Sequence, residues 1–426
     1  MERTRGYKPR MAAEAARAIL PPLPAVSRRF VALYTLAFLS TTLLFVAPLL
    51  VTLALKINAL VGIEQAPGSL ALVAGVGAFL ALFANPFFGM LSDRTIGRLG
   101  KRRPWMLLGL VIGTAGVFVV AVAPSIPIVL LGWCVAQLGF NALLAAMAAV
   151  LPDKVPPSQR GIVAGILGVC VPVAAVAGAG LVNLFAGNQL AMFLGPCAVA
   201  AVFIVLFAVT FKDSSAQTRE RLSFRYLAGT FFVSPRKHPD FSWVFTGRFL
   251  MVLAYSFLTT FLAYYLIAQL NSSEQQVPWQ ILLGTLVQSA VVIVASVTGG
   301  RLSDRTGRRK IFVISASIVY GAGMFALALA GDITAYLVAM AIAGLGFGLY
   351  LAVDLALVVD VLPESDRAAA HLGVLNIAGA LPSSIAPAIA PAILLMTGGS
   401  YAGLYTVAGV CALLGAAAVI PVRGAR

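Results

Sequence analysis

The stretch GMLSDRTIGRLGKRRPW (residues 89–105) places six charged side chains between two long apolar runs. Charge is scarce elsewhere, because only 11% of the 426 residues are charged while 60% are hydrophobic, and the mean hydropathy is +0.97. Residues 106–152, 161–211 and 368–422 contain no Asp, Glu, Lys or Arg. A crossing of the ~30 Å hydrocarbon core needs about 20 apolar residues, so each run is long enough for two crossings. The sequence therefore predicts an α-helical protein that crosses a membrane many times.

The polar breaks divide the chain into twelve apolar segments, and we expect an all-α polytopic membrane protein with twelve transmembrane helices. The segments lie near residues 30–55, 68–92, 105–124, 127–151, 161–185, 190–211, 243–270, 279–301, 311–331, 334–361, 370–396 and 400–422.

The basic residues predict the orientation of these segments. If the N-terminus is cytoplasmic, the two tails and every second loop hold all but two of the 30 Lys and Arg residues, the exceptions being Lys56 and Arg248. Basic loops stay on the cytoplasmic side, so we expect a multi-pass protein of the cell membrane with both termini in the cytoplasm. The net charge of +15 then reflects topology and contact with the lipid bilayer, and no nucleic-acid partner is expected.

Three sequence markers recur in the same order in both halves of the chain. LSDRT (91–95) returns at 302–306, DKVPPSQR (153–160) returns as DVLPESDR (360–367), and LSTTLL (39–44) is echoed by FLTTFL (257–262). Such recurrence indicates a duplicated unit, here two parallel, pseudo-symmetric six-helix bundles. We therefore divide the chain into a cytoplasmic tail (1–29), an N-terminal bundle (30–211), a cytoplasmic linker (212–242) and a C-terminal bundle (243–422).

Twelve segments in two halves, with an LSDRT loop after the second and the eighth, resemble the major facilitator superfamily. The longer stretch SDRTIGRLGKRRPW (92–105) is similar to the same loop in its glycoside–cation symporters and sucrose-type transporters. The resemblance implies a transporter that works by alternating access, with segments 1, 4, 7 and 10 around a central cavity. It also implies networks of charged residues that latch the cytoplasmic side in the outward-open state.

The repeated loops supply the residues of this expected cytoplasmic gate. Glycines at 89 and 300 let helices approach closely, and the carboxylates of Asp93 and Asp304 are suited to accept hydrogen bonds from a helix end or an arginine. The alternative is that these charges only enforce topology. The gate residues are Gly89, Asp93, Arg94, Asp153, Arg160, Gly300, Asp304, Arg305, Asp360 and Arg367, with Asp153 and Asp360 expected within reach of Arg94 and Arg305.

Two charged residues fall inside apolar segments and are functional candidates, because ionisable groups are costly in a membrane. At a rise of ~1.5 Å per residue, Arg248 and Asp354 come within about 5 Å of each other in depth, so we expect them to pair. Asp354 is then a candidate protonation site coupled to the solute. The alternatives are a static ion bridge, or an Arg248 side chain that reaches the headgroups.

Polar uncharged residues in the segments are candidates for binding a polyhydroxylated ligand, which needs many hydrogen bonds. The alternative reading is that they form hydrogen bonds between helices, worth ~1 kcal/mol each. The candidates are Tyr350, Tyr255, Gln137, Asn141, Gln288 and Asn376.

We expect a monomeric secondary transporter of a small polar solute, of the sugar or glycoside class, driven by protons. The sodium-coupled relatives carry acids in segments 2 and 4, which are absent here apart from Asp153 at the end of segment 4. The alternatives are a uniporter, a proton-antiport exporter of drugs or amphipathic metabolites, and a non-transporting receptor or assembly factor. No enzyme motif, metal-ligand spacing or cofactor signature is found, so we expect no enzyme, cofactor or metal.

Overall fold

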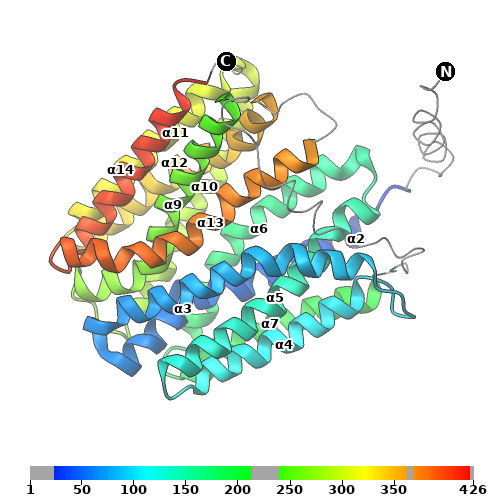
Figure 1. Cartoon of the computed structure of the whole chain (residues 1–426), viewed down its shortest axis with the longest axis horizontal. Coiled ribbons are helices and arrows are strands. Elements are labelled where there is room, and N and C mark those ends of the chain that lie inside the picture. The colour runs from blue at the N-terminus through cyan, green and yellow to red at the C-terminus, as the bar shows by residue number, and fades with distance from the viewer. Residues whose placement is uncertain (1–23, 212, 214–238, 362–367, 423–426) are drawn as a thin grey trace, which may run out of the picture.

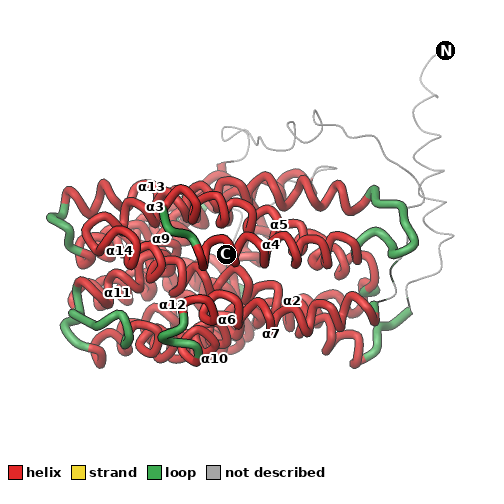
Figure 2. The backbone as a smooth tube through the Cα atoms, turned by 90° about the horizontal axis from the view of Figure 1, so that it is seen from below, coloured by secondary structure: helices red, strands yellow, loops and turns green. Residues whose placement is uncertain are grey.

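The computed structural model describes residues 24–211, 213, 239–361 and 368–422, and the regular structure in these ranges is entirely helical (Figure 2). The elements are α2 (Arg28–Ala47), the π-helical turn η1 (Pro48–Thr52), α3 (Leu53–Asp93), α4 (Arg103–Val122), α5 (Ile126–Lys154), α6 (Pro157–Leu184), α7 (Gln189–Thr210), α9 (Pro239–Ala268), α10 (Val277–Thr306), α11 (Arg309–Leu329), α12 (Ile333–Val361), α13 (Ala368–Met396) and α14 (Tyr401–Val419).

Within the described part of the chain, eleven helical runs are long and apolar enough to cross a membrane. The first run, Arg28–Asp93, has 66 residues, or about 99 Å at 1.5 Å per residue, which is far more than one crossing requires. It kinks at Gly62, whose φ of 75° and ψ of 163° are readily adopted only by glycine. Residues 56–67 were expected to form a polar break between two segments, but they are helical apart from this kink.

Two groups of helices form the molecule, and Figure 1 shows α2–α7 beside α9–α14. Two helix pairs join the groups, because α3 packs against α13 and α6 packs against α10. In the first pair, a methyl group added at Gly75 would lie 3.5 Å from the carbonyl oxygen of Ser384. In the second, the Ser289 hydroxyl donates to the Pro172 carbonyl at 3.1 Å.

The two groups of helices are in contact at one end of the molecule and diverge toward the other. We call the end with connections 94–102, 155–156 and 307–308 the basic end, and the end with connections 123–125, 185–188 and 269–276 the far end. At the far end the groups touch, because the Tyr264 hydroxyl donates to the Ala54 carbonyl at 3.0 Å and the Asn58 amide donates to the Glu274 carboxylate. Figure 1 shows the two groups diverging toward the basic end.

Glycines allow close packing of α4 on α5. An added methyl group would lie 2.2 Å from the Phe140 ring at Gly113, 2.4 Å from the Ala136 nitrogen at Gly116, and 2.3 Å from the Gly113 nitrogen at Gly139. Such small-residue interfaces are typical of membrane helices, where van der Waals contact drives association.

The second group packs α11 on α12 in the same way. A methyl group added at Gly323 would lie 2.6 Å from the Ala343 nitrogen, and one at Gly346 would lie 2.3 Å from the Tyr320 nitrogen. Both groups therefore contain a backbone-to-backbone helix pair.

The substitution Gly139→Ala tests this packing. The new methyl group meets backbone atoms that cannot rotate away, so we expect the helices to separate and the stability to fall by ~1–3 kcal/mol, as for other overpacked sites. Thermal unfolding of the detergent-purified protein measures the loss. Gly165→Ala in α6 is the control, because a methyl group there has nothing within 4 Å outside its own helix backbone. An equal loss of stability in both variants would show that the close α4–α5 contact at Gly139 does not account for the effect.

Candidate functional site

The structure brings Arg248 of α9 and Asp354 of α12 together in an ion pair between Nη1 and Oδ2. The other carboxylate oxygen, Oδ1, accepts a hydrogen bond of 2.6 Å from the Tyr350 hydroxyl. Tyr350 lies one helical turn before Asp354 and therefore on the same face of α12. The side chains of Arg248 and Asp354 are 19% and 9% exposed. Each oxygen of this enclosed carboxylate thus has one donor.

A third helix approaches the pair from the opposite side of the guanidinium. A methyl group added at Gly379 of α13 would lie 3.6 Å from Nη2 and 3.8 Å from Nε of Arg248. Nε itself is buried and has no hydrogen-bond partner. The pair therefore lies where α9, α12 and α13 meet, and part of the guanidinium is unused.

Aromatic rings extend from this pair toward α11. Tyr255 of α9 stacks on Phe347 of α12, with ring centroids 4.2 Å apart and an interplanar angle of 2°. The Phe347 ring also lies 6.0 Å from Tyr320 and 6.5 Å from Tyr350. The sequence analysis missed Phe347 and Tyr320. Phe347 lies three residues before Tyr350, a helical spacing that places both on one face.

Two of the amide candidates, Gln137 and Asn141, pair with each other and not with Arg248. Asn141 of α5 donates to the carbonyl of Gln137 at 2.8 Å and to its side-chain oxygen at 3.1 Å, and both residues are buried. The Nε2 of Gln288 is buried without a partner. The Asn376 side chain is outside the described residues. No contact among the described residues links these amides to Arg248.

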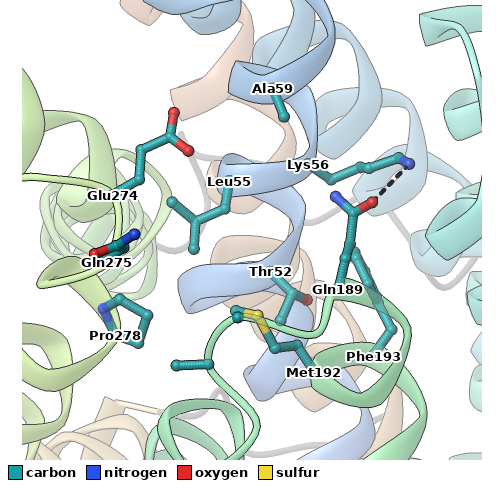
Figure 3. Close-up of a pocket in the computed structure, with 12 residues that line it drawn as sticks. Thr52, Leu55, Lys56, Ala59, Gln189, Met192, Phe193, Glu274, Gln275 and Pro278 are labelled. Atoms are coloured by element: carbon teal, nitrogen blue, oxygen red, sulfur yellow. Dashed lines mark hydrogen bonds between the residues drawn. The ribbon is translucent and has the colours of Figure 1, made fainter.

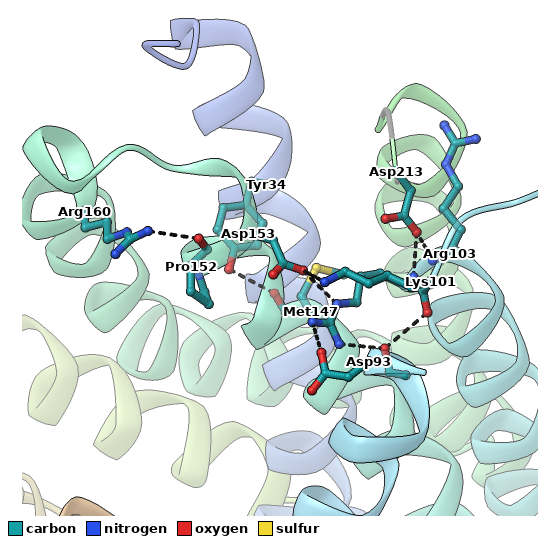
Figure 4. A network of polar contacts seen from close by, with 11 residues as sticks. Tyr34, Asp93, Lys101, Arg103, Met147, Pro152, Asp153, Arg160 and Asp213 are labelled. Carbon is teal, nitrogen blue, oxygen red and sulfur yellow. Dashed lines mark hydrogen bonds and ion pairs between the residues drawn. The ribbon is translucent and has the colours of Figure 1, made fainter. Parts of the chain in front are cut away.

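A second polar cluster lies at the basic end, centred on Arg102 at the start of α4 (Figure 4). Arg102 is only 3% exposed. It forms ion pairs with Asp93 at the end of α3 and, through Nε at 2.9 Å, with Asp153 near the end of α5. Its Nη1 also donates to the Ser92 hydroxyl at 2.9 Å, and Lys101 adds a contact of 3.1 Å to Asp153. One arginine thus joins the ends of three helices.

This geometry corrects the expected partner of Asp153, which pairs with Arg102 and Lys101 instead of Arg94. The reason is the fold of loop 94–102, which returns the chain so that the Arg102 side chain, at the start of α4, reaches the ends of both α3 and α5. Asp213 contributes as well, because its carboxylate accepts hydrogen bonds from the backbone N–H groups of Arg102 and Arg103 at the start of α4. No local sequence signal predicts a contact over 111 residues.

The remaining gate candidates play other parts in the structure. Arg160 donates to the carbonyls of Val155 and Pro152 at 2.9 and 3.0 Å, at the end of α5. Close approach at Gly89 and Gly300 is not found, because an added methyl group would meet Ala145 and Ala352 at ordinary distances of 4.0 and 3.8 Å. Within the described residues Asp304 and Arg305 are exposed and form no ion pair, the Asp360 side chain is not described, and Arg367 lies outside the described ranges.

A cavity of about 200 Å³ lies at the far end, between the two groups of helices (Figure 3). Lys56 borders it, is only 5% exposed, and donates to the Ala121 carbonyl at 2.9 Å and to Gln189 Oε1 at 3.2 Å. The ammonium group therefore neutralises the carbonyl end of α4, where a cation is favourable. This contact accounts for one of the two basic residues that do not fit the topology pattern. The lining residues are Thr52, Leu55, Lys56, Ala59, Ala186, Gly187, Gln189, Met192, Phe193, Glu274, Gln275 and Pro278.

The Arg102 cluster is tested by comparing Arg102→Gln with Arg94→Gln. The first change leaves Asp93 and Asp153 without their shared partner. Removal of one member of a buried pair costs ~3–5 kcal/mol, and because Asp93 is largely exposed we expect about 2–3 kcal/mol here. Arg94→Gln breaks no described ion pair, so its thermal unfolding midpoint should stay close to that of the unchanged protein. Equal midpoints for the two variants would contradict the assignment of Arg102 as the central residue.

Comparison with known proteins identifies the family of the chain. The family model of the Major Facilitator Superfamily matches residues 29–286 and again residues 244–425. Three solved structures are similar to the chain, each aligned over 92% of it. They are a mutant of the nucleoside transporter NupG (TM-score 0.74, 14% identity, 99% of that chain), a D-xylose-proton symporter (0.68, 15%, 98%) and a bacterial homologue of the human lysosomal transporter Spinster in an inward-facing, occupied conformation (0.64, 17%, 95%). No curated protein matches the chain in sequence. The family match covers nearly the whole described chain, and the protein belongs to the Major Facilitator Superfamily of membrane transporters.

Proposed function

We propose that the protein is a secondary active transporter that moves a small polar solute of the sugar or glycoside class across the cytoplasmic membrane by alternating access, together with protons. The observation that carries this proposal is the Arg248–Asp354 ion pair, enclosed among membrane-spanning helices and bonded by Tyr350. A group that gains and loses a proton inside the membrane is what coupling to a proton gradient requires. Similarity of fold to a nucleoside transporter and to a xylose-proton symporter supports a hydroxylated solute.

Twelve crossings in two pseudo-symmetric bundles, residues 30–211 and 243–422, are part of this proposal. The kink at Gly62 then divides the 66-residue first run into two crossings. The matching glycine interfaces of α4–α5 and α11–α12 support the internal symmetry. We place the basic end in the cytoplasm, since positively charged loops are retained there, and both termini with it.

The described conformation then corresponds to a state that faces the cytoplasm. The far end is closed by the Tyr264 and Asn58 hydrogen bonds, while the two bundles diverge at the basic end. The Arg102 cluster lies wholly within the first bundle and keeps its basic end rigid. In the opposite state, we expect the two LSDRT loops, with Asp93 and Asp304, to close the basic end.

Protonation of Asp354 gives a simple coupling step. It removes the negative charge that holds Arg248, and the guanidinium is then free to bind the solute or to change its helix contacts. In the static-bridge alternative, the ion pair only fixes the packing of α9 on α12. Solute movement is then independent of pH. The stacked rings of Tyr255 and Phe347 offer an apolar face, and this observation favours proton-antiport export of amphipathic compounds as the second candidate function.

Asp354→Asn tests the coupling. The protein is reconstituted in liposomes with a pH-sensitive dye inside, and a panel of neutral and acidic mono- and disaccharides is added outside. We expect the interior to acidify with at least one of these solutes, and Asp354→Asn to slow this acidification at least 10-fold, because the amide carries no exchangeable acid proton. Solute counterflow without a proton gradient should persist in the variant.

The control for this experiment is Glu64→Gln, because Glu64 is an exposed acid of α3 whose loss should leave both signals unchanged. Acidification that survives in Asp354→Asn would assign coupling elsewhere and favour the static bridge. Absence of acidification by the unchanged protein with every sugar would contradict the proposed solute class. Antiport of amphipathic compounds would be tested next.

A further inference from the structure

The guanidinium of Arg248 uses only one of its two binding edges. Nη1 pairs with Asp354, whereas Nε is buried without a partner, and Nη2 forms no hydrogen bond among the described residues. Nε and Nη2 lie side by side in the planar fork, with two parallel N–H bonds. This spacing matches the two oxygens of a carboxylate, so the free edge is a complete bidentate site.

The free edge faces α13 at Gly379, a position without a side chain. A methyl group added at Gly379 would lie 3.6 Å from Nη2 and 3.8 Å from Nε, and would therefore cover both donors of that edge at once. Glycine places no side chain against these donors. The Arg248 side chain is 19% exposed, while its Nε is buried.

An unused donor of this kind is unusual in a folded protein. Nearly all buried polar groups find partners, and an unpaired one lowers stability, more so when it is charged. The one acid available is already committed, because Asp354 accepts from both Arg248 and Tyr350. No second acidic side chain of the described residues pairs with Arg248. A ligand from outside the chain is thus the natural partner of the free edge.

We propose that the Nε–Nη2 edge of Arg248 binds the carboxylate of the transported solute, and that the solute is a polyhydroxylated acid such as a sugar acid. This inference rests on the proposed function and narrows its substrate class. A neutral hydroxyl accepts one hydrogen bond from one of the two donors, whereas a carboxylate fills both with charge-assisted bonds. The edge therefore discriminates an acid from the matched neutral sugar.

Binding of such an anion also gives a role to the neighbouring carboxylate of Asp354. Two carboxylates on one guanidinium carry a net charge of −1, and a proton on Asp354 restores neutrality. The charged and titratable groups that act on Asp354 are Arg248 from α9 and Tyr350 from its own helix, and the described parts of α10 and α11 contribute none. Solute and proton would then enter together without net charge.

The experiment compares uptake of D-glucuronate and D-glucose, and of D-galacturonate and D-galactose, by the reconstituted full chain. The members of each pair differ only in whether C6 is a carboxylate or an alcohol. We expect at least one acid to be taken up with kcat/KM at least 10-fold above that of its neutral partner. Gly379→Ala, which places a methyl group against the edge, should raise the KM of the acid at least 10-fold and change that of the neutral sugar less than threefold.

Two further variants keep this test independent of folding. Arg248→Lys retains the charge and loses the fork, so the preference for the acid should fall toward unity. Gly180→Ala adds a methyl group that meets only Leu282 at 3.8 Å, and it should leave both uptakes unchanged. Thermal unfolding confirms that each variant is folded before uptake is measured.

The outcomes separate the two proposals. Equal uptake of acid and neutral sugar, or equal effects of Gly379→Ala on both, would overturn the anion site and leave the sugar transporter in place. Uptake of neither class of sugar would overturn both. A preference for the acid that is lost in Gly379→Ala and Arg248→Lys would establish the free edge as the specificity-determining site.

Discussion

Neutralisation of charge inside a membrane is the constraint on which this structure depends. Arg248 and Asp354 lie on helices far apart in the sequence, and each alone would be costly in an apolar surrounding. Their pairing fixes the rotation and the depth of α9 against α12, and the guanidinium then fixes where α13 passes, at Gly379. The same interaction that makes these helices compatible with the membrane also creates a carboxylate whose charge a proton can change. In the proposed mechanism, packing and coupling are thus consequences of one contact.

Rigidity and mobility are distributed unevenly around this contact. Within each bundle, glycines bring backbones so close that a methyl group would clash, at Gly139 in the first and at Gly346 in the second. Such interfaces do not slide. Between the bundles, the far end is held by two hydrogen bonds, from Tyr264 and from Asn58. A hydrogen bond contributes only ~1 kcal/mol net, so these far-end contacts can break in the movement that the proposed alternating access requires.

Contacts that depend on helix geometry could be predicted from the sequence, whereas contacts that depend on the conformation of a loop could not. The number of residues between a charge and its helix end gives its depth directly, so Arg248 and Asp354 were matched in depth. The resemblance to a family in which segments 7 and 10 both line the cavity then predicted that they pair. The gate pairing was wrong, because loop 94–102 decides whether Arg94 or Arg102 meets Asp153, and loop geometry depends on tertiary contacts such as that of Asp213. The break at 56–67 was also wrong, since Gly62 turns the helix without a loop.

The unused edge of Arg248 distinguishes a binding site from a structural bridge. A bridge that served only to fix packing would gain from a second acceptor on α13, where a short polar side chain in place of Gly379 would reach both donors. Lysine would neutralise Asp354 with fewer donors left unpaired. The chain instead places a residue with five donors in the membrane, uses one edge, and places a glycine beside the other. That combination lowers stability unless a ligand completes the site, and the expected ligand is one with two acceptor oxygens and a negative charge.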